Sequence, residues 1–309
     1  MQSWMGKPYY SLDAFLHEQF QEKVYKAALD AGFTCPNRDG TAGERGCIFC
    51  SAGGSGDFAG DRRLPVSLQL EQQIRRIRSR RPVKKFIAYF QAFTNTYGPA
   101  EKLEALYREA LSCPEVAALS IATRPDCLPP PVVGLLARLN REKPIWVELG
   151  LQTIHEKTAE YLRRGYPLSC FEEAVKNLRA AGLDIIVHVI LGLPGETEEQ
   201  MLDTIRFLNR LPIRGIKLQL LHVLSGTDLA EDYEKGYFRV LAREEYIELL
   251  IRCLEELRPD IVIHRLTGDG PKKLLIAPQW SSAKRSVLNT LHHEMALRRT
   301  WQGRLYQTN

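Results

Sequence analysis

The sequence lacks the features that place a protein in a membrane or in an oxidising compartment. No apolar run approaches the ~18 residues of a membrane span, and Met1 to Pro8 contain no apolar stretch of the kind found in signal peptides. Cysteine is scarce, and its count of seven in 309 residues is odd, which argues against a framework of disulfides. These absences predict a cytoplasmic globular protein without a membrane partner.

Net charge is modest, +5 at pH 7, but the basic residues fall into two groups. Such groups can bind the phosphate backbone of a nucleic acid. The alternative for the first group is the solvated face of a helix, because Ile74 and Ile77 mark an apolar stripe opposite it. Both groups can contact one backbone only if the C-terminal segment folds back beside the first helix. The first group is Arg75, Arg76, Arg78, Arg80, Arg81, Lys84 and Lys85. The second group is Lys272, Lys273, Lys284, Arg285, Arg298 and Arg299.

Three cysteines near the N-terminus are the most informative residues. Eleven residues separate Cys35 from Cys47, and two separate Cys47 from Cys50. Three thiolates can hold three irons of a cubane cluster and leave the fourth iron open to an outside ligand. A Cys-x-x-Cys pair is also half of a structural zinc site, which would need a further ligand. The spacing is compatible with a cubane cluster and with a zinc site. No second close pair exists among the other cysteines, Cys113, Cys127, Cys170 and Cys253.

Hydrophobic periodicity alternates between the spacing of a strand and that of a helix along most of the chain. Six strands, each followed by a helix, are typical of a parallel sheet with right-handed crossovers. Six units are fewer than the eight of a closed barrel, so we expect a partial, open barrel, with a doubly wound sheet as the alternative. The expected strands are residues 24–33, 86–90, 116–122, 145–151, 184–191 and 216–223, and the expected helices are 68–78, 99–111, 129–139, 155–163, 169–181, 196–208 and 243–257.

In either architecture, ligands bind at the carboxyl ends of the strands. The cysteine loop follows the first predicted strand, and polar or glycine-rich segments follow the other five. Any one of these could be a turn or a helix cap, but together they indicate a catalytic face. The segments are Gln91–Tyr97, Thr123–Asp126, Glu148–Thr153, His188–Glu196, and the pair Gln219 and His222.

With its cysteine loop in this position, the chain resembles the radical S-adenosylmethionine (SAM) superfamily. Within that superfamily it is similar to the YhcC/YtqA-type family, in the branch of the elongator catalytic subunit. The first gap between cysteines is longer than is usual in the superfamily, but such gaps occur in this branch. The resemblance runs from about Val24 to Gln302, and its distinctive segments are Cys35–Thr41, Tyr89–Tyr97 and Arg265–Lys272.

The resemblance implies an α/β fold, a partial (β/α)6 barrel of the TIM type with N- and C-terminal extensions. The implied division is an N-terminal extension over 1–23, the barrel over 24–258 and a C-terminal extension over 259–309. It also implies two cofactors, a 4Fe-4S cluster and SAM. The cluster would be bound by Cys35, Cys47 and Cys50, and SAM would bind the open iron through its amine and carboxylate.

The same resemblance assigns the residues around SAM. Gln91, Phe93 and Thr94 would meet its amino group, although the Gly-Gly-Glu motif usual in the superfamily is absent. Arg164 would pair with its carboxylate, which a planar guanidinium suits; the alternative is a surface salt bridge with Glu160. Gln152 would contact the polar edge of the cofactor, His188 is a candidate catalytic residue, and the turn against the adenine would be Gly192, Leu193 and Pro194.

The implied activity is reductive cleavage of SAM, with one electron from an external reductant of the flavodoxin or ferredoxin type. Cleavage gives methionine and a 5′-deoxyadenosyl radical, which removes a hydrogen atom from the substrate. The elongator-like resemblance and the basic groups point to tRNA, and to a modified wobble uridine. Trp280 and Trp301 either stack on bases or pack within the C-terminal segment. A small metabolite or porphyrin-like substrate is one alternative, and a zinc-stapled, non-enzymatic RNA-binding protein is the other.

Overall fold

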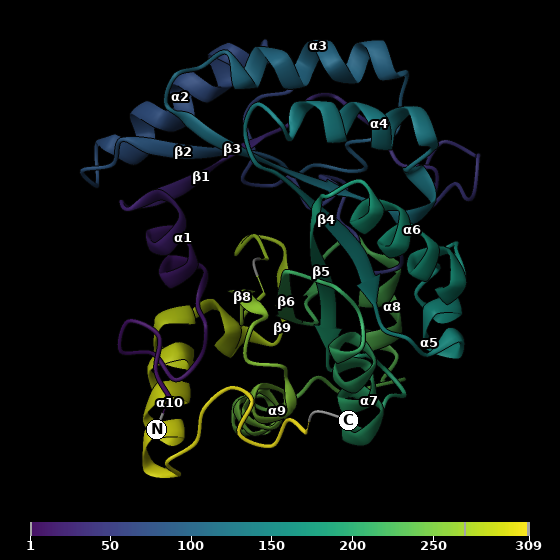
Figure 1. Cartoon of the computed structure of the whole chain (residues 1–309). Helices are drawn as coiled ribbons and strands as arrows, with labels where there is room; N and C mark the ends of the chain where they lie inside the picture. The colour runs from purple at the N-terminus through teal and green to yellow at the C-terminus, as the bar shows by residue number, and fades with distance from the viewer. Residues whose placement is uncertain (1, 269, 308–309) are drawn as a thin grey trace.

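A curled parallel sheet forms the centre of the molecule. The computed structural model describes residues 2–268 and 270–307. Seven strands lie in the order β1-β2-β3-β4-β5-β6-β8, and every neighbouring pair is parallel. The sheet bends into part of a barrel, with helices along its outer side (Figure 1). The partial α/β barrel expected from the sequence is confirmed.

The elements agree with the predicted alternation of strands and helices. The strands are β1 (Val24–Leu29), β2 (Lys85–Phe90), β3 (Val116–Thr123), β4 (Ile145–Gln152), β5 (Asp184–Leu191), β6 (Gly215–Leu220) and β8 (Val262–Arg265). The outer helices are α2 (Val66–Arg78), α3 (Ala100–Leu111), α4 (Pro130–Leu139), α6 (Leu168–Ala180), α7 (Glu198–Asn209) and α9 (Arg243–Glu256). The remaining elements are α1 (Leu12–Phe20), α5 (Glu156–Tyr161), α8 (Asp228–Glu234), α10 (Lys284–Leu297), two 3-10 turns (Pro125–Cys127 and Gln279–Ser282), and the pair β7 (Val223–Leu224) and β9 (Leu275–Ala277).

Two expectations for the ends of the sheet need correction. The sixth predicted strand ends at Leu220, and the residues that follow form β7, which pairs antiparallel with β9 in a separate sheet. The segment expected as a C-terminal extension contributes a seventh strand, β8, beside β6. Its four residues, VIHR, are too few to show a strand period.

The strands have two different faces because alternate residues point to opposite sides. The outward residues form the main core with the outer helices. The inward residues at the amino ends form a second core with α1, whose Phe15 and Leu16 pack against Ile87, Trp146 and Ile186. Helix α1 therefore closes the floor of the barrel. The inward residues two positions further along are polar: Lys26, Tyr89, Ser120, Glu148, His188, Lys217 and His264.

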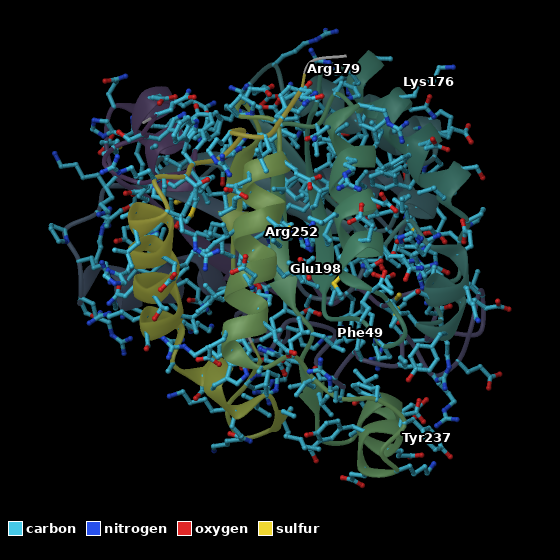
Figure 2. All side chains as sticks on the ribbon, turned by 90° about the horizontal axis from the view of Figure 1, so that it is seen from below. Phe49, Lys176, Arg179, Glu198, Tyr237 and Arg252 are labelled. Carbon is cyan, nitrogen blue, oxygen red and sulfur yellow. The ribbon has the colours of Figure 1, made fainter. Side chains whose placement is uncertain are left out.

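The two ends of the chain are held together by Gln302, which is fully buried. Its side-chain oxygen accepts from Tyr10 N at 2.9 Å, and its amide donates to the carbonyls of Arg258 and Ile261. On the outside, Arg252 of α9 contacts Glu198 at the start of α7 (Figure 2). The terminal segments are thus fastened to the barrel.

No helix among the described residues has both the length and the apolarity needed to cross a bilayer.

The two basic groups do not converge, so the condition for their contact with one stretch of backbone is not met. Lys84 and Lys85 stand at the amino end of β2, and Arg78 bonds there to Val83 O and Glu115. Lys272, Lys284 and Arg285 lie near Gln91, which follows the carboxyl end of the same strand. A six-residue strand separates the groups by about 20 Å. The second group is itself divided, because Arg298 lies at the far end of α10 and pairs with Glu248 and Glu294.

Candidate active site

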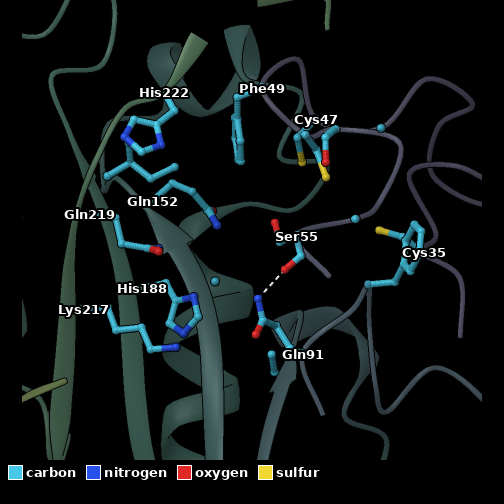
Figure 3. A pocket seen from close by; sticks show the side chains of 18 of the residues that line it. Cys35, Cys47, Phe49, Ser55, Gln91, Gln152, His188, Lys217, Gln219 and His222 are labelled. Atoms are coloured by element: carbon cyan, nitrogen blue, oxygen red, sulfur yellow. Dashed lines mark hydrogen bonds between the residues drawn. The ribbon is translucent and has the colours of Figure 1, made fainter. Parts of the chain in front are cut away.

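A cavity of about 250 Å³ opens at the carboxyl ends of the strands. The loop after β1 and the segments after β2 and β4 meet around it, with inward residues of β5 and β6 on its wall (Figure 3). Most of the residues assigned from the sequence line it: Cys35, Cys47, Cys50, Gln91, Phe93, Thr94, Gln152, Arg164 and His188.

Two side chains of the segment Cys35–Thr41 fix the path of the cysteine loop. Asn37 donates to the carbonyls of Arg163 and Arg164 and also contacts Cys47 Sγ at 3.5 Å. Arg38 donates to the carbonyls of Cys50 and Ser51 at 2.9 and 2.8 Å. The first half of the loop therefore holds the second half in place. Sequence spacing alone did not identify these two residues as supports of the site.

The three thiols line this one cavity in a mostly buried environment. Burial raises the pKa of Cys47 to about 12, and it raises the pKa of Cys50 as well. The neighbouring guanidiniums of Arg124 and Arg38 act in the opposite direction by favouring the thiolates. All seven cysteines are free of disulfides, and no three His, Cys, Asp or Glu side chains in the described ranges come close enough to hold one metal ion. Three cysteines spread around a cavity fit a group larger than a single ion, as a cubane cluster is.

The segment after β2 packs directly against the cysteine loop. Phe93 N donates to Gly54 O at 2.9 Å, and Thr94 N donates to Thr34 O. A Cβ on Gly54 would lie 2.4 Å from the Phe93 ring, so only glycine allows this approach. Gln91 donates to Ser55 O (Figure 3). This segment therefore positions the loop, whatever it also contributes to a cofactor.

Two of the assigned residues have a left-handed backbone. Phe93 has φ of 59° and Gln152 has φ of 66°, a region that few residues other than glycine adopt. At Gln152 the pairing of β4 with β5 also shifts register. Strain of this kind is often found where a side chain must be aimed at a ligand. Gln152 is thereby turned into the cavity at the end of β4.

Arg164 is more deeply buried than a surface salt bridge would allow, with 2% of its surface exposed. Its guanidinium donates to the carbonyls of Tyr166, Leu151 and Thr153 and contacts Glu156 at 3.1 Å. It therefore holds the turn after β4, and its partner is not the Glu160 considered from the sequence. Its role at the SAM carboxylate stays a prediction.

Gly192, Leu193 and Pro194 are not among the described residues that line the cavity. Gly192 has φ of 83° and lies against Leu241, while Leu193 is 3% exposed. Leu193 belongs to a small core that also contains Ile48 of the cysteine loop. In this structure the turn over Gly192–Pro194 supports the cysteine loop through this small core. Its contact with adenine stays a prediction.

A charged layer lies below the cysteines, and its centre is the fully buried Glu148. One carboxylate oxygen accepts from Lys26 and from Ser120, each at 2.5 Å. The other accepts from His188 at 2.7 Å and from Lys217. Lys217 also donates to the Tyr89 hydroxyl at 3.0 Å. Five strands thus meet at one carboxylate, which no sequence motif indicated.

The charge states in this layer follow from burial and pairing. Although burial opposes ionisation, the ammonium groups of Lys217 and Lys26 hold the pKa of Glu148 well below its usual range. Burial lowers the pKa of His188 to about 4 and that of Lys217 to about 7. Because an ionised Glu148 can only accept, His188 must carry its proton on Nε2. Its Nδ1 is then an acceptor and cannot supply a proton at neutral pH.

Comparisons with known proteins identify the family to which the chain belongs. The family model described as the radical SAM superfamily matches residues 39–208, and that of the radical SAM C-terminal domain matches residues 213–296. YtqA from Bacillus subtilis is 45% identical over 301 residues, which are 97% of this chain and 94% of YtqA. The chain belongs to the radical SAM superfamily. Its cofactors are accordingly a 4Fe-4S cluster and SAM, and it is a radical SAM enzyme.

More distant relatives share the fold or part of the chain. The structure of archaeal Elp3 from Methanocaldococcus infernus, without its residues 1–46, matches with a TM-score of 0.70 at 17% identity. That match covers 90% of this chain and 64% of the Elp3 chain. The tRNA uridine(34) acetyltransferase of Methanocaldococcus jannaschii is 26% identical over 162 residues, which are 52% of this chain and 29% of that enzyme. The Elp3 likeness supports the partial barrel.

Arg164→Ala will lower the free energy of unfolding by about 2–4 kcal/mol, because several carbonyl oxygens lose a buried donor. Arg163→Ala is the matched control: this neighbour is 41% exposed and pairs with Asp228, so its loss will cost less than about 1 kcal/mol. Anaerobic urea unfolding and SAM titration measure both effects. If Arg164→Ala keeps wild-type stability and loses only SAM affinity, the arginine is a cofactor ligand and not a support of the turn.

Stability will fall as the pH is lowered from about 6.5 towards 4, partly because of His188. The unfolded chain binds a proton on this ring near pH 6.5, whereas the folded protein does so only near pH 4. The free energy of unfolding therefore falls by up to about 1.4 kcal/mol per pH unit in this window. His188→Gln keeps a donor for Glu148 without titrating, so urea unfolding will show a shallower fall. The exposed His293→Gln serves as control and will follow the wild type; equal slopes for all three proteins would contradict the assignment.

Proposed function

We propose that this enzyme modifies tRNA, with a wobble uridine that already carries a modification as its substrate. The observation that carries the proposal is the similarity to the tRNA uridine(34) acetyltransferase. Because that match covers 29% of the acetyltransferase, acetyl transfer is not carried over to this chain. What is carried over is the target, a uridine in tRNA. Such an enzyme would work in the cytoplasm.

We assign the cluster to Cys35, Cys47 and Cys50, which line one cavity on a loop fixed by Asn37 and Arg38. These three cysteines would hold the cluster, and the bound cofactors would supply radical chemistry: with one electron from an external reductant of the flavodoxin or ferredoxin type, SAM would be cleaved and hydrogen would be abstracted from the substrate. Gln91, Phe93 and Thr94 are assigned to the amino group of SAM because they adjoin the cysteine loop, and Gln152, which also lines the cavity, is assigned to the polar edge of the cofactor.

The chain's own residues would shape the space below SAM. Tyr89, Glu148, His188 and Lys217 line the deep part of the cavity, and helix α1 closes the floor beneath them. Helix α1 covers the amino ends of the strands, so the substrate would enter from their carboxyl ends. There His188 Nδ1 can accept a hydrogen bond and Lys217 can donate one, which suits a polar ring such as a pyrimidine base. These groups orient the substrate; none of them is required as a proton donor.

The test is a comparison of tRNA nucleosides from cells with and without this protein. Digested tRNA is separated by liquid chromatography and mass spectrometry. We expect one modified wobble uridine to disappear and its precursor to accumulate, and the wild-type gene to restore the profile, whereas a gene encoding Cys50→Ala will not. Identical nucleoside profiles in the two strains would contradict a tRNA substrate and favour a small metabolite or a porphyrin-like molecule.

A further inference from the structure

A second cavity of about 760 Å³ adjoins the first at the mouth of the barrel. Gln91, His222 and Gly270 line both cavities, so the two share a wall. The wider cavity is basic, since no Asp or Glu occurs among its described lining residues while Lys272, Lys284 and Arg285 do. Its remaining wall is Phe58, Leu275, Ser281, Ser282, Ala283 and Ser286.

The first turn of α10 forms one side of this cavity. Ala283 is at the N-cap, and its methyl side chain cannot cap the turn. The first turn contains no acidic residue, and Lys284 and Arg285 stand there instead. Backbone N–H groups at a helix start carry partial positive charge, which adds to the positive charge of these two side chains. The positive charges of the helix start and of the side chains would all attract an anion.

An unsatisfied buried atom on the shared wall points to a ligand independently. His222 Nε2 is buried and has no hydrogen-bond partner among the residues that the structure describes. The ring is held by the segment Arg265–Lys272, because a Cβ on Gly268 or Gly270 would lie 2.3 or 2.7 Å from it. Burial lowers the pKa of His222 to about 4, so the ring is neutral and can form one hydrogen bond through Nε2. Asp269 of this segment lies outside the described residues.

An exposed aromatic side chain also lines this cavity. Phe58 follows the cysteine loop and is 47% exposed, which is unusual for a phenylalanine. A base of single-stranded RNA can stack on such a ring. The wider cavity therefore combines an anion site with a stacking surface beside the opening to the radical cavity.

We propose that the cavity at the start of α10 is a subsite for the RNA backbone, which binds a phosphodiester while the adjacent base enters the deeper cavity. This proposal rests on the proposed tRNA substrate. Lys272, Lys284 and Arg285 bind the phosphate together with the first N–H groups of α10, and His222 Nε2 bonds to the nucleotide as it passes the shared wall. Phosphate contacts fix the position of the strand, and the deeper cavity selects the base.

The experiment measures binding of tRNA from cells lacking this protein to anaerobic holoenzyme at several salt concentrations. In the test variant, Lys272, Lys284 and Arg285 are all changed to Gln. We expect weaker binding and a smaller salt slope, by about 0.7–0.9 for each lost contact. The control variant changes Arg76, Arg80 and Lys84 to Gln. It removes the same charge at the opposite end of the barrel and will keep the wild-type slope. Iron content and thermal midpoints show that both variants are folded.

Phe58→Ala separates stacking from charge. We expect tRNA affinity to fall on the order of tenfold with an unchanged salt slope, because no phosphate contact is lost. Phe58→Tyr keeps the ring and will restore most of the affinity. An unchanged affinity in the Ala variant would remove Phe58 from the subsite.

The outcomes distinguish the subsite from the proposed function. If the wild type binds tRNA and both triple variants lose the same slope, only net charge matters and the subsite is wrong. If the test variant binds tRNA as the wild type does, the subsite is wrong and the tRNA substrate stands. If the wild type shows no salt-dependent tRNA binding, the proposed function itself fails. A titration of the wild type and the test variant with inorganic phosphate examines whether the cavity binds a free anion instead of RNA. If the test variant loses phosphate binding but keeps tRNA binding, the cavity is a site for a free anion.

Discussion

The structure depends on one buried carboxylate in the middle of the barrel. A carboxylate that is removed from water without partners would be too costly to keep ionised. Glu148 is ionised because Lys26, Lys217, His188 and Ser120, from four other strands, all donate to it. Removing one partner of such a network typically costs about 3–5 kcal/mol. The same contacts fix the inward side chains that form the lower wall of the cavity, so stability and the shape of the site have a common origin.

The inside of the barrel is divided into three levels by the alternation of strand residues. Apolar residues at the amino ends pack on α1, the ionic layer lies above them, and the cysteine loop with its neighbours closes the top. The cavity therefore opens at the carboxyl ends of the strands. A chemistry that produces a reactive radical needs such a site, because the surrounding groups must position the substrate and exclude competing reactions.

The sequence predicted the partial barrel and most residues around the cavity, because strand alternation and the cysteine loop are local patterns. It missed β8, which is too short to show a period. It named Glu148 and His188 but could not show that they meet Lys26, Ser120 and Lys217, because this meeting depends on the register of five strands. It also could not show that Arg164 binds backbone carbonyls. The two basic groups could not be placed relative to one another, because no strand or helix was predicted after residue 257, where the second group lies.

The central claim is that Cys35, Cys47 and Cys50 hold the cluster that cleaves SAM. The most direct measurement is the formation of 5′-deoxyadenosine by anaerobic protein supplied with SAM and a strong one-electron reductant. The wild type will form it, Cys50→Ala will not, and Cys170→Ala on α6 will match the wild type because Cys170 is not among the described residues that line the cavity. Formation of 5′-deoxyadenosine by Cys50→Ala at the wild-type rate would contradict the account.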